Sequence, residues 1–259
     1  MADQPKGDSV LFEVADGVAW VTINRPEARN AINQAVSEGL SDAWDRVESD
    51  DGIAVAVLTG AGEVAFSAGA DLKEMAARAE RELPSHLLAG RLANGEVSKP
   101  VIAAVNGVAY AGGFNLVMQC DLCVAADHAR FGILEAKVGR GSPWANQLGW
   151  LISPRAAIEL LCTAEPISAL RAYELGLVNR VVPAAQLRSA TAELAAAISA
   201  NAPLTVRAGK AMVRATAGLS PSEAAAVADG IYKPVYASND AQEGPRAFAE
   251  KRPPRWQGR

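Results

Sequence analysis

The stretch that decides the fold is Asn106–Asn115, which reads NGVAYAGGFN. It follows the apolar, β-branched run Val101–Val105, which predicts a strand, and Gly112 falls where the next helix should begin. An earlier stretch, Phe66–Leu72 (FSAGADL), has the same arrangement after another expected strand. Small residues such as Gly69 allow a backbone to come close to a neighbouring group. We therefore predict two strand-to-helix turns in which the backbone comes close to a neighbouring group.

Such turns have a chemical use. The first N–H groups of a helix lack partners within the helix and lie at its positive end, so they can stabilise a negative oxygen. Two turns could hold one thioester carbonyl oxygen as it becomes an enolate or tetrahedral anion, an effect often worth about 3 kcal/mol per donor. Either turn taken alone is more simply a tight connection. The chain has no G-x-x-x-x-G-K or G-x-G-x-x-G motif, so nucleotide chemistry is poorly supported.

Outward from these turns, the chain alternates short β-branched runs with amphipathic segments, which predicts an α/β core. Strands are expected at 18–23, 53–59, 101–105, 122–126 and 129–133, and helices at 32–48, at 86–97 and from about residue 112. Beyond Ser153 the pattern becomes helical, and we expect no further strands. Ser153 and Pro154 form a helix start, and Gly176 is placed to end the helix that contains residues 171–175.

The C-terminal part has a pattern of its own. Ser220 and Glu223 have the spacing of a capping box, and we predict a core over 1–200 followed by a helical region over 201–259. Short helices flanked by Pro203, Pro221 and Pro234 have little core, so their apolar faces should pack on the core or on another subunit. We expect an oligomer, with residues 252–259 as a loosely held tail.

Composition excludes several classes of function. The 259 residues carry a formal net charge of −4, which does not favour binding to nucleic acid or to anionic membranes. Cys120, Cys123 and Cys162 suggest neither a disulfide framework nor a zinc site, and we expect buried, reduced thiols. Residues 1–9 lack a signal or transit pattern, and no apolar run approaches the roughly 20 residues that span a bilayer. A cytoplasmic protein without metal is the expectation.

Motifs in a fixed order resemble the enoyl-CoA hydratase/isomerase family, also called the crotonase superfamily. They are NRP at 24–26 with NAIN at 30–33, the two glycine-bearing segments at 66–75 and 106–121, FG at 131–132 with Glu135, AYELGLV at 172–178 and AFAEKR at 247–252. The resemblance covers about 10–252. It implies a spiral of ββα units with a C-terminal helical trimerisation region, assembled as a homotrimer or a dimer of trimers.

The same resemblance implies that the N–H groups of Ala70 and Gly112 form the oxyanion hole. Glu135 matches the second of two glutamates in the family's hydratases, whereas Asn115 stands where the first would be. Adding water normally divides its proton transfers between two carboxylates, but moving a double bond needs one base that removes and returns a proton. Asn115 either completes the first turn of its helix or orients water, and both interpretations stay open.

The predicted function is therefore an acyl-CoA enzyme of this family, with one glutamate as acid and base. Another reaction on the same fold, such as decarboxylation, thioester hydrolysis or an unusual dehydration, and a non-catalytic acyl-CoA-binding protein are the alternatives. No cofactor is expected, because CoA is part of the substrate. The sequence does not determine the acyl group, nor whether the reaction is hydration or isomerisation.

The loop after Glu135 departs from the glycine-rich loop of the hydratases and reads GRGSPW at 139–144. Trp144 could narrow the acyl cavity, stack on a substrate ring or belong to the core. Arg140 could pair with Glu135 or with a substrate carboxylate, or it could be solvated. Both are candidate specificity residues.

Local positive charge is needed for the CoA phosphates. Residues that the resemblance implies in CoA binding are Arg25, Arg29, Ala68, Asp71 and Leu72, together with Phe248 and Lys251 acting from a neighbouring subunit. Packing on a helix surface is the simpler alternative for the last two. His86 and His128 lie in no metal or nucleophile motif and are predicted to be structural.

Overall fold

The computed structural model describes residues 8–77 and 90–259, and their strands form two sheets. The larger sheet has the strand order β1 (Val10–Ala15), β2 (Val18–Ile23), β3 (Val55–Gly60), β5 (Val101–Val105), β7 (Leu122–Ala126) and β10 (Arg180–Val182). The β1 strand is antiparallel to β2, and the other neighbours are parallel. Buried on both faces, the parallel strands carry the near-continuous apolar runs that made them visible in the sequence.

A smaller sheet is built from short strands, most of which follow a strand of the larger sheet in the sequence. Its strands are β4 (Ala65–Ser67), β6 (Val108–Tyr110), β8 (Arg130–Gly132) and β9 (Ile167–Ser168), of which the first three are parallel. Each of β3, β5 and β7 is followed by one of these short strands, and α2 (Leu72–Ala77) and α4 (Gly112–Gln119) come directly after β4 and β6. This repetition confirms the expected spiral of ββα units.

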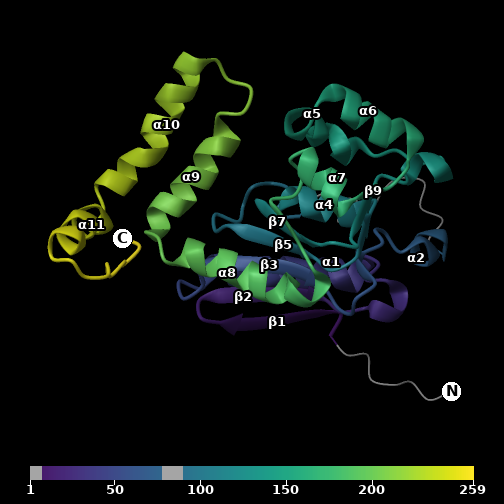
Figure 1. The fold of residues 1–259 in the computed structure, drawn as a ribbon, viewed down its shortest axis with the longest axis horizontal. Coiled ribbons are helices and arrows are strands. Elements are labelled where there is room, and N and C mark those ends of the chain that lie inside the picture. Colours follow the sequence, from purple (N-terminus) through teal and green to yellow (C-terminus); the bar gives the residue numbers. More distant parts are fainter. Residues whose placement is uncertain (1–7, 78–89) are drawn as a thin grey trace.

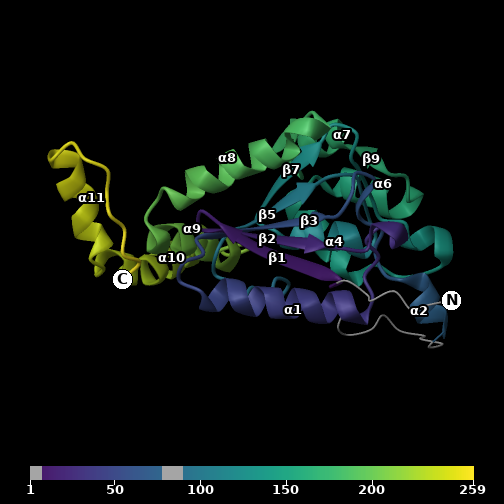
Figure 2. The same ribbon diagram turned by 90° about the horizontal axis from the view of Figure 1, so that it is seen from below.

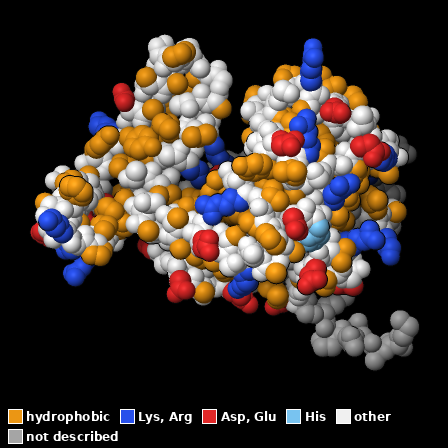
Figure 3. Space-filling model, viewed as in Figure 1, with side chains coloured by type: hydrophobic (Ala, Val, Ile, Leu, Met, Phe, Trp, Pro, Cys, Tyr) orange, Lys and Arg blue, Asp and Glu red, His pale blue; other side chains and the backbone are white. Residues whose placement is uncertain are grey.

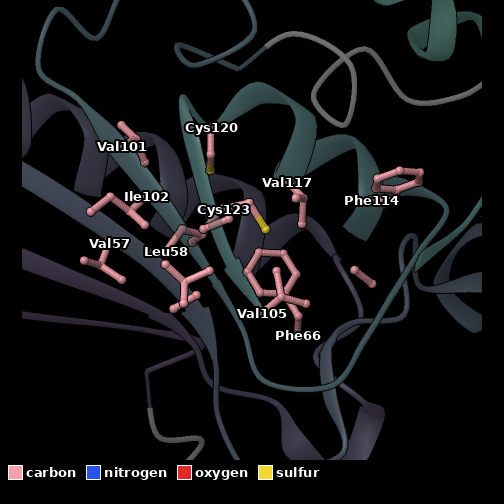
Figure 4. Close-up of a cluster of buried hydrophobic side chains, with 14 of the residues drawn as sticks. Val57, Leu58, Phe66, Val101, Ile102, Val105, Phe114, Val117, Cys120 and Cys123 are labelled. Carbon is pink, nitrogen blue, oxygen red and sulfur yellow. The ribbon is translucent and has the colours of Figure 1, made fainter. Parts of the chain in front are cut away.

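Helices cover both faces of the larger sheet. Figure 2 shows α1 (Gln34–Ser49) beneath the sheet and α8 (Leu187–Ser199) above it. The core lies where the strands meet α4, and Figure 4 shows Phe66, Phe114 and Val117 packed there beside strand residues. The rings of Phe114 and Phe131 meet edge to face at 5.6 Å between centroids. This packing fixes α4 relative to β4, which precedes it, and to β8, which follows it.

Most of the other helices form two groups. On one side are the short 3₁₀ helices η2 (Glu135–Val138) and η3 (Pro143–Gln147) with α5 (Leu148–Leu151), α6 (Pro154–Thr163) and α7 (Ala169–Glu174). On the other, α9 (Pro203–Ala215), α10 (Pro221–Tyr236) and α11 (Asp240–Ala249) project away from the sheets (Figure 1). The helix starts at Ser153 and Ser220 are confirmed, the second as a full capping box. None of the described helices has the length and apolar character to cross a membrane.

Several sequence-based expectations were wrong. Strands continue after Ser153, because β9 and β10 pair with earlier strands although each is only two or three residues long. The expected helix at 86–97 lies partly outside the described residues, and its described part, 90–97, is not helical and has turns at 91–95. His86 also lies outside them. Pro234 does not bound a helix but lies inside α10, and Cys162 is exposed, unlike Cys120 and Cys123.

The segment 252–259 is held in place rather than loose, which corrects another expectation. Arg252 makes a two-pronged contact with the buried Glu243, with its Nη1 2.6 Å from Oε1 and its Nη2 3.0 Å from Oε2. Asp240 accepts hydrogen bonds from the backbone N–H groups of Gln257 and Gly258. Two buried acids of α11 therefore fasten the end of the chain, a long-range pairing that a Pro- and Arg-rich composition does not indicate.

Replacing Glu243 by Ala is expected to release this segment. Hydrogen bonds from Arg252 and Arg246 hold the pKa of Glu243 well below its ordinary value, so the ionised form is the anchor. The contribution of this anchor to stability is fully present above the ordinary glutamate pKa of about 4.3, and it is lost progressively as pH falls from that value to the lowered pKa of the folded state. Hydrogen exchange of the backbone amides at 255–259, followed by mass spectrometry at pH 7, should become roughly tenfold faster or more. Glu250→Ala, which removes one exposed contact to Arg252, should change it far less.

Candidate active site

The two glycine-bearing turns pack directly against each other. Gly69 has φ +90°, and a Cβ atom placed there would lie 2.9 Å from the backbone N of Gly112 and 2.8 Å from Tyr110 O. A Cβ placed on Gly112 would in turn lie 3.6 Å from the backbone N of Ala70. The close approach that the sequence predicted is therefore an approach of one turn to the other, and it brings two backbone N–H groups into one place.

Hydrogen bonds orient the first turn. Ile32 N–H donates to Gly69 O at 2.8 Å, and Asp71 N–H donates to Ile32 O at 2.9 Å. Because successive residues of an extended chain point to opposite sides, the N–H of Ala70 points away from Ile32. Among the described residues, no group accepts a hydrogen bond from Ala70 N–H.

The second turn is strained at one residue. Ala111 has φ 51° and ψ −123°, a combination that costs a residue with a side chain of order 1–3 kcal/mol. Its N–H donates to Gly132 O at 2.9 Å, and its carbonyl accepts from Asn115 N–H at 3.0 Å. The strain is held by these bonds and places Gly112 first in α4, where a helical N–H has no partner within the helix. No other acceptor for Gly112 N–H occurs in the described part of the chain.

A cavity of about 210 Å³ opens beside these two turns. Eight of the residues singled out in the sequence line it: Ala68, Ala70, Leu72, Gly112, Asn115, Glu135, Arg140 and Trp144. Leu72 and Val138 are each 60% exposed, so they mark the mouth of the cavity. Residues from three units of the spiral thus converge on one apolar space with few polar groups, the usual form of a small-molecule site.

Glu135 is the titratable side chain of special interest in this cavity. It begins η2, is 8% exposed, and its Oε1 accepts a hydrogen bond from Trp144 Nε1 at 3.2 Å. Its Oε2 is buried without a hydrogen-bond partner. Burial raises the pKa of Glu135 above its ordinary value, although hydrogen bonds from its own N–H and from Trp144 oppose the rise. A carboxyl with a raised pKa is a stronger proton acceptor once ionised.

Asn115 lies in the first turn of α4 and is 3% exposed. Its Oδ1 has no hydrogen-bond partner, so this oxygen does not complete the first turn of the helix. An unsatisfied buried acceptor costs about 1–3 kcal/mol, which is tolerated at sites where a ligand supplies the donor.

Other candidate residues lie outside this cavity. Arg25 forms an ion pair with Asp71 at 3.0 Å and donates through Nη1 to Ala31 O at 2.7 Å, so it braces the first turn. Burial acts in the opposite direction, but the hydrogen bond from Arg25 holds the pKa of Asp71 below its ordinary value. Arg29 is exposed, and its carbonyl accepts from Ala68 N–H at 3.0 Å. These contacts show structural roles for Arg25 and Asp71 that the sequence did not reveal.

Phe248 and Lys251 lie far from the cavity within this chain. Phe248 belongs to α11 and Lys251 follows it, and Figure 1 shows α11 at the opposite end of the molecule from α2. Phe248 is 87% exposed. Any contact of these residues with a ligand in the cavity would need a second copy of the chain.

Sequence reasoning missed five apolar lining residues: Ile32, Met75, Ala111, Leu134 and Val138. A signal existed for Met75, because it follows Leu72 by three residues and so shares a face of α2 with it. No cluster of three or more potential metal ligands occurs among residues 8–77 and 90–259.

The chain is similar to known proteins over nearly its whole length. Residues 13–259 match the profile of the enoyl-CoA hydratase/isomerase family. Enoyl-CoA hydratase EchA19 of Mycobacterium tuberculosis is 41% identical, with all of both chains covered, and carnitinyl-CoA dehydratase of Proteus mirabilis is 40% identical over 97% of this chain and 99% of the relative. A crystal structure of an enoyl-CoA hydratase from M. tuberculosis H37Rv superimposes with a TM-score of 0.90 at 42% identity, covering 98% of this chain and 100% of the other.

Proposed function

Because the chain belongs to the enoyl-CoA hydratase/isomerase family, we propose that it acts on its acyl-CoA substrate through an enolate, held by the N–H groups of Ala70 and Gly112, with Glu135 as the acid and base. The observation that carries this proposal is a single cavity. It contains the N–H groups of Ala70 and Gly112, which have no protein acceptor in the described chain, and a buried oxygen of Glu135 without a partner.

The proposed steps follow from these groups. Glu135 Oε2 takes a proton from the α-carbon of the thioester, and the electron pair of the C–H bond moves to the thioester oxygen as the enolate forms. The two N–H groups donate to that oxygen, which carries more negative charge in the enolate than in the substrate, so the transition state is stabilised more than the ground state. Return of the proton from Glu135 to carbon completes the cycle.

CoA binding is proposed at the mouth of this cavity. Arg25 and Asp71, which brace the first turn, and the exposed Arg29 supply polar groups nearby, while Ala68 and Leu72 provide backbone and apolar contacts.

An assembly as a homotrimer or a dimer of trimers is part of the proposal. In the single chain α10 has no buried residue, and Figure 3 shows hydrophobic side chains across α9, α10 and α11. Tyr236 is 76% exposed and Phe248 is 87% exposed. A second copy would cover such surfaces, and it would bring Phe248 and Lys251 to a neighbouring CoA site.

Isotope exchange tests the proposed proton transfer. A panel of saturated acyl-CoA thioesters, from butyryl-CoA upward in chain length, is incubated with the enzyme in D₂O, and deuterium at the α-carbon is measured by mass spectrometry. A saturated thioester has no double bond to hydrate or move, so the exchange reports the base and the oxyanion hole alone. We expect catalysed incorporation with at least one member; none with any member would contradict the proposal.

A further inference from the structure

Two unpaired acceptor oxygens belong to the same cavity. Asn115 Oδ1 and Glu135 Oε2 are both buried, neither has a hydrogen-bond partner, and both residues line the space beside Ala70 and Gly112. A third such atom in the described chain, Ser37 Oγ, belongs to α1 and does not line this space. A ligand that satisfies two acceptors must bring two hydrogen-bond donors, or one donor that they share.

Trp144 explains why only one oxygen of Glu135 is free. The indole has a single N–H, which donates to Glu135 Oε1 at 3.2 Å from a side chain that is itself 9% exposed. Trp144 belongs to η3, which begins at Pro143 and packs near α4. The bond fixes the plane of the carboxylate, because one oxygen is held by the protein and the other is left for the cavity.

We propose that Trp144 is a positioning residue for Glu135, and that it leaves Glu135 Oε2 and Asn115 Oδ1 to hold together the water that adds to a 2-enoyl thioester, or the β-hydroxyl group of the hydrated product. This inference rests on the proposed function and deepens it. It selects hydration and dehydration over simple migration of a double bond, since migration needs a base but no site for water.

The step can be written with one carboxylate. The two O–H bonds of the water donate to Asn115 Oδ1 and to Glu135 Oε2. The water oxygen forms a bond to the β-carbon, the π electrons move through the α-carbon to the thioester oxygen, and the proton passes to Oε2. Glu135 then gives that proton to the α-carbon, so one water is added and the carboxylate is restored. Asn115 orients the water but accepts no proton.

Trp144 also affects the proton affinity of its partner. Its N–H stabilises the ionised carboxylate and so opposes the rise in the pKa of Glu135 that burial causes. Removing the N–H should therefore raise this pKa further. Because Glu135 must be ionised to accept a proton, the acid limb of the pH profile should move to higher pH.

The test compares two reactions in the same variants. The first is α-proton exchange in the saturated thioester that exchanges fastest with the wild-type enzyme, and the second is hydration of the 2-enoyl thioester of the same acyl chain. Trp144→Phe keeps an aromatic ring but lacks the N–H; we expect hydration to fall roughly ten- to a hundredfold, with its acid limb at higher pH. Trp150→Phe, at a tryptophan that is 78% exposed on α5, is the matched control and should change neither reaction.

Asn115→Leu removes the second acceptor at similar size. We expect hydration to fall by at least tenfold and by a clearly larger factor than exchange, because exchange needs no water site. Asn115→Asp retains an acceptor and should keep more hydration than the leucine variant, which guards against a loss caused by misfolding.

The outcomes separate the proposed function from the proposed water site. Exchange without any hydration by the wild-type enzyme would overturn the water site and leave the proposed function intact. Absence of both reactions would overturn the proposed function itself. A Trp144→Phe variant with an unchanged pH profile and rate would remove the positioning role, and equal losses of exchange and hydration in Asn115→Leu would remove the role of Asn115 in holding water.

Discussion

Replacing Glu135 by Gln is expected to reduce α-proton exchange by roughly 10²- to 10⁴-fold, the range for loss of a positioned acid–base group. The amide has the same length and cannot accept the proton. Its carbonyl oxygen can still accept the hydrogen bond from Trp144, which is 3.2 Å from Oε1 in the native carboxylate, so the side chain should stay in place. The rate of deuterium incorporation, measured beside the affinity for the thioester by calorimetry, should show lost turnover and retained binding.

A neighbouring glutamate provides the matched control. Glu165 lies outside the cavity and pairs with Lys137 of η2 at 2.8 Å, so Glu165→Gln removes a carboxylate that is attached to the same short helix as Glu135. The pair is exposed and should contribute little to stability. We expect near wild-type exchange in this variant. A Glu135→Gln enzyme that keeps a third or more of its activity would contradict the assignment of the base.

Replacing Glu135 by Gln should not destabilise the fold at alkaline pH. Burial raises the pKa of Glu135 in the folded state above its value in the unfolded chain. The folded protein therefore loses stability as pH rises through the interval between these two pKa values, and the glutamine variant has no such loss. Thermal unfolding at pH 8 should show a midpoint for Glu135→Gln at or above that of the wild type. As pH falls toward 4, the midpoint of the wild type should rise relative to that of the variant. This behaviour is typical of groups kept for function at a cost in stability.

Much of the fold could be read from local patterns, and the failures have a common cause. Strands 18–23, 101–105 and 122–126 were predicted at the bounds that the structure shows, because buried parallel strands give continuous apolar runs. The β9 and β10 strands are two and three residues long, and their existence depends on partners that are distant in sequence. The anchoring of the end of the chain by Asp240 is likewise a contact between residues 17 and 18 positions apart, without a local signal.

The candidate site divides in the same way. Small residues in two turns predicted a close approach, and ordered motifs indicated Ala70, Gly112 and Glu135 as its chemical groups. The hydrogen bond from Trp144 to Glu135 could not be predicted. The two residues are nine positions apart with a glycine-rich bend between them, and the direction of an indole depends on the packing of η3. For the same reason the sequence could not decide whether Asn115 completes the first turn of its helix. The answer depends on the hydrogen bonding of a single atom, Oδ1.

Replacing Gly69 by Ala is expected to reduce catalysis by roughly 10²- to 10³-fold, the effect of losing one oxyanion donor. The new methyl group would lie 2.9 Å from Gly112 N and 2.8 Å from Tyr110 O, so the two turns must move apart. Backbone N–H groups cannot be removed by mutation of their own side chains, and displacing one turn from the other is the most direct way to test them. The ratio kcat/KM for exchange or hydration is the measurement.

Gly176 separates this effect from backbone strain. Its φ of +86° is close to the +90° of Gly69, so alanine at either position adopts an unfavourable conformation that costs of order 1–3 kcal/mol. No heavy atom lies within 4 Å of a Cβ at Gly176, which lies after α7 and does not line the cavity. Gly176→Ala should therefore lower the unfolding temperature through backbone strain alone and keep its activity. Gly69→Ala adds the clash with the second turn, so it should unfold at a lower temperature still and lose activity. If Gly69→Ala retained full activity, the paired turns could not be the groups that stabilise the enolate. A shift of a few tenths of an ångström at Gly112 N would directly weaken its hydrogen bond to the enolate oxygen.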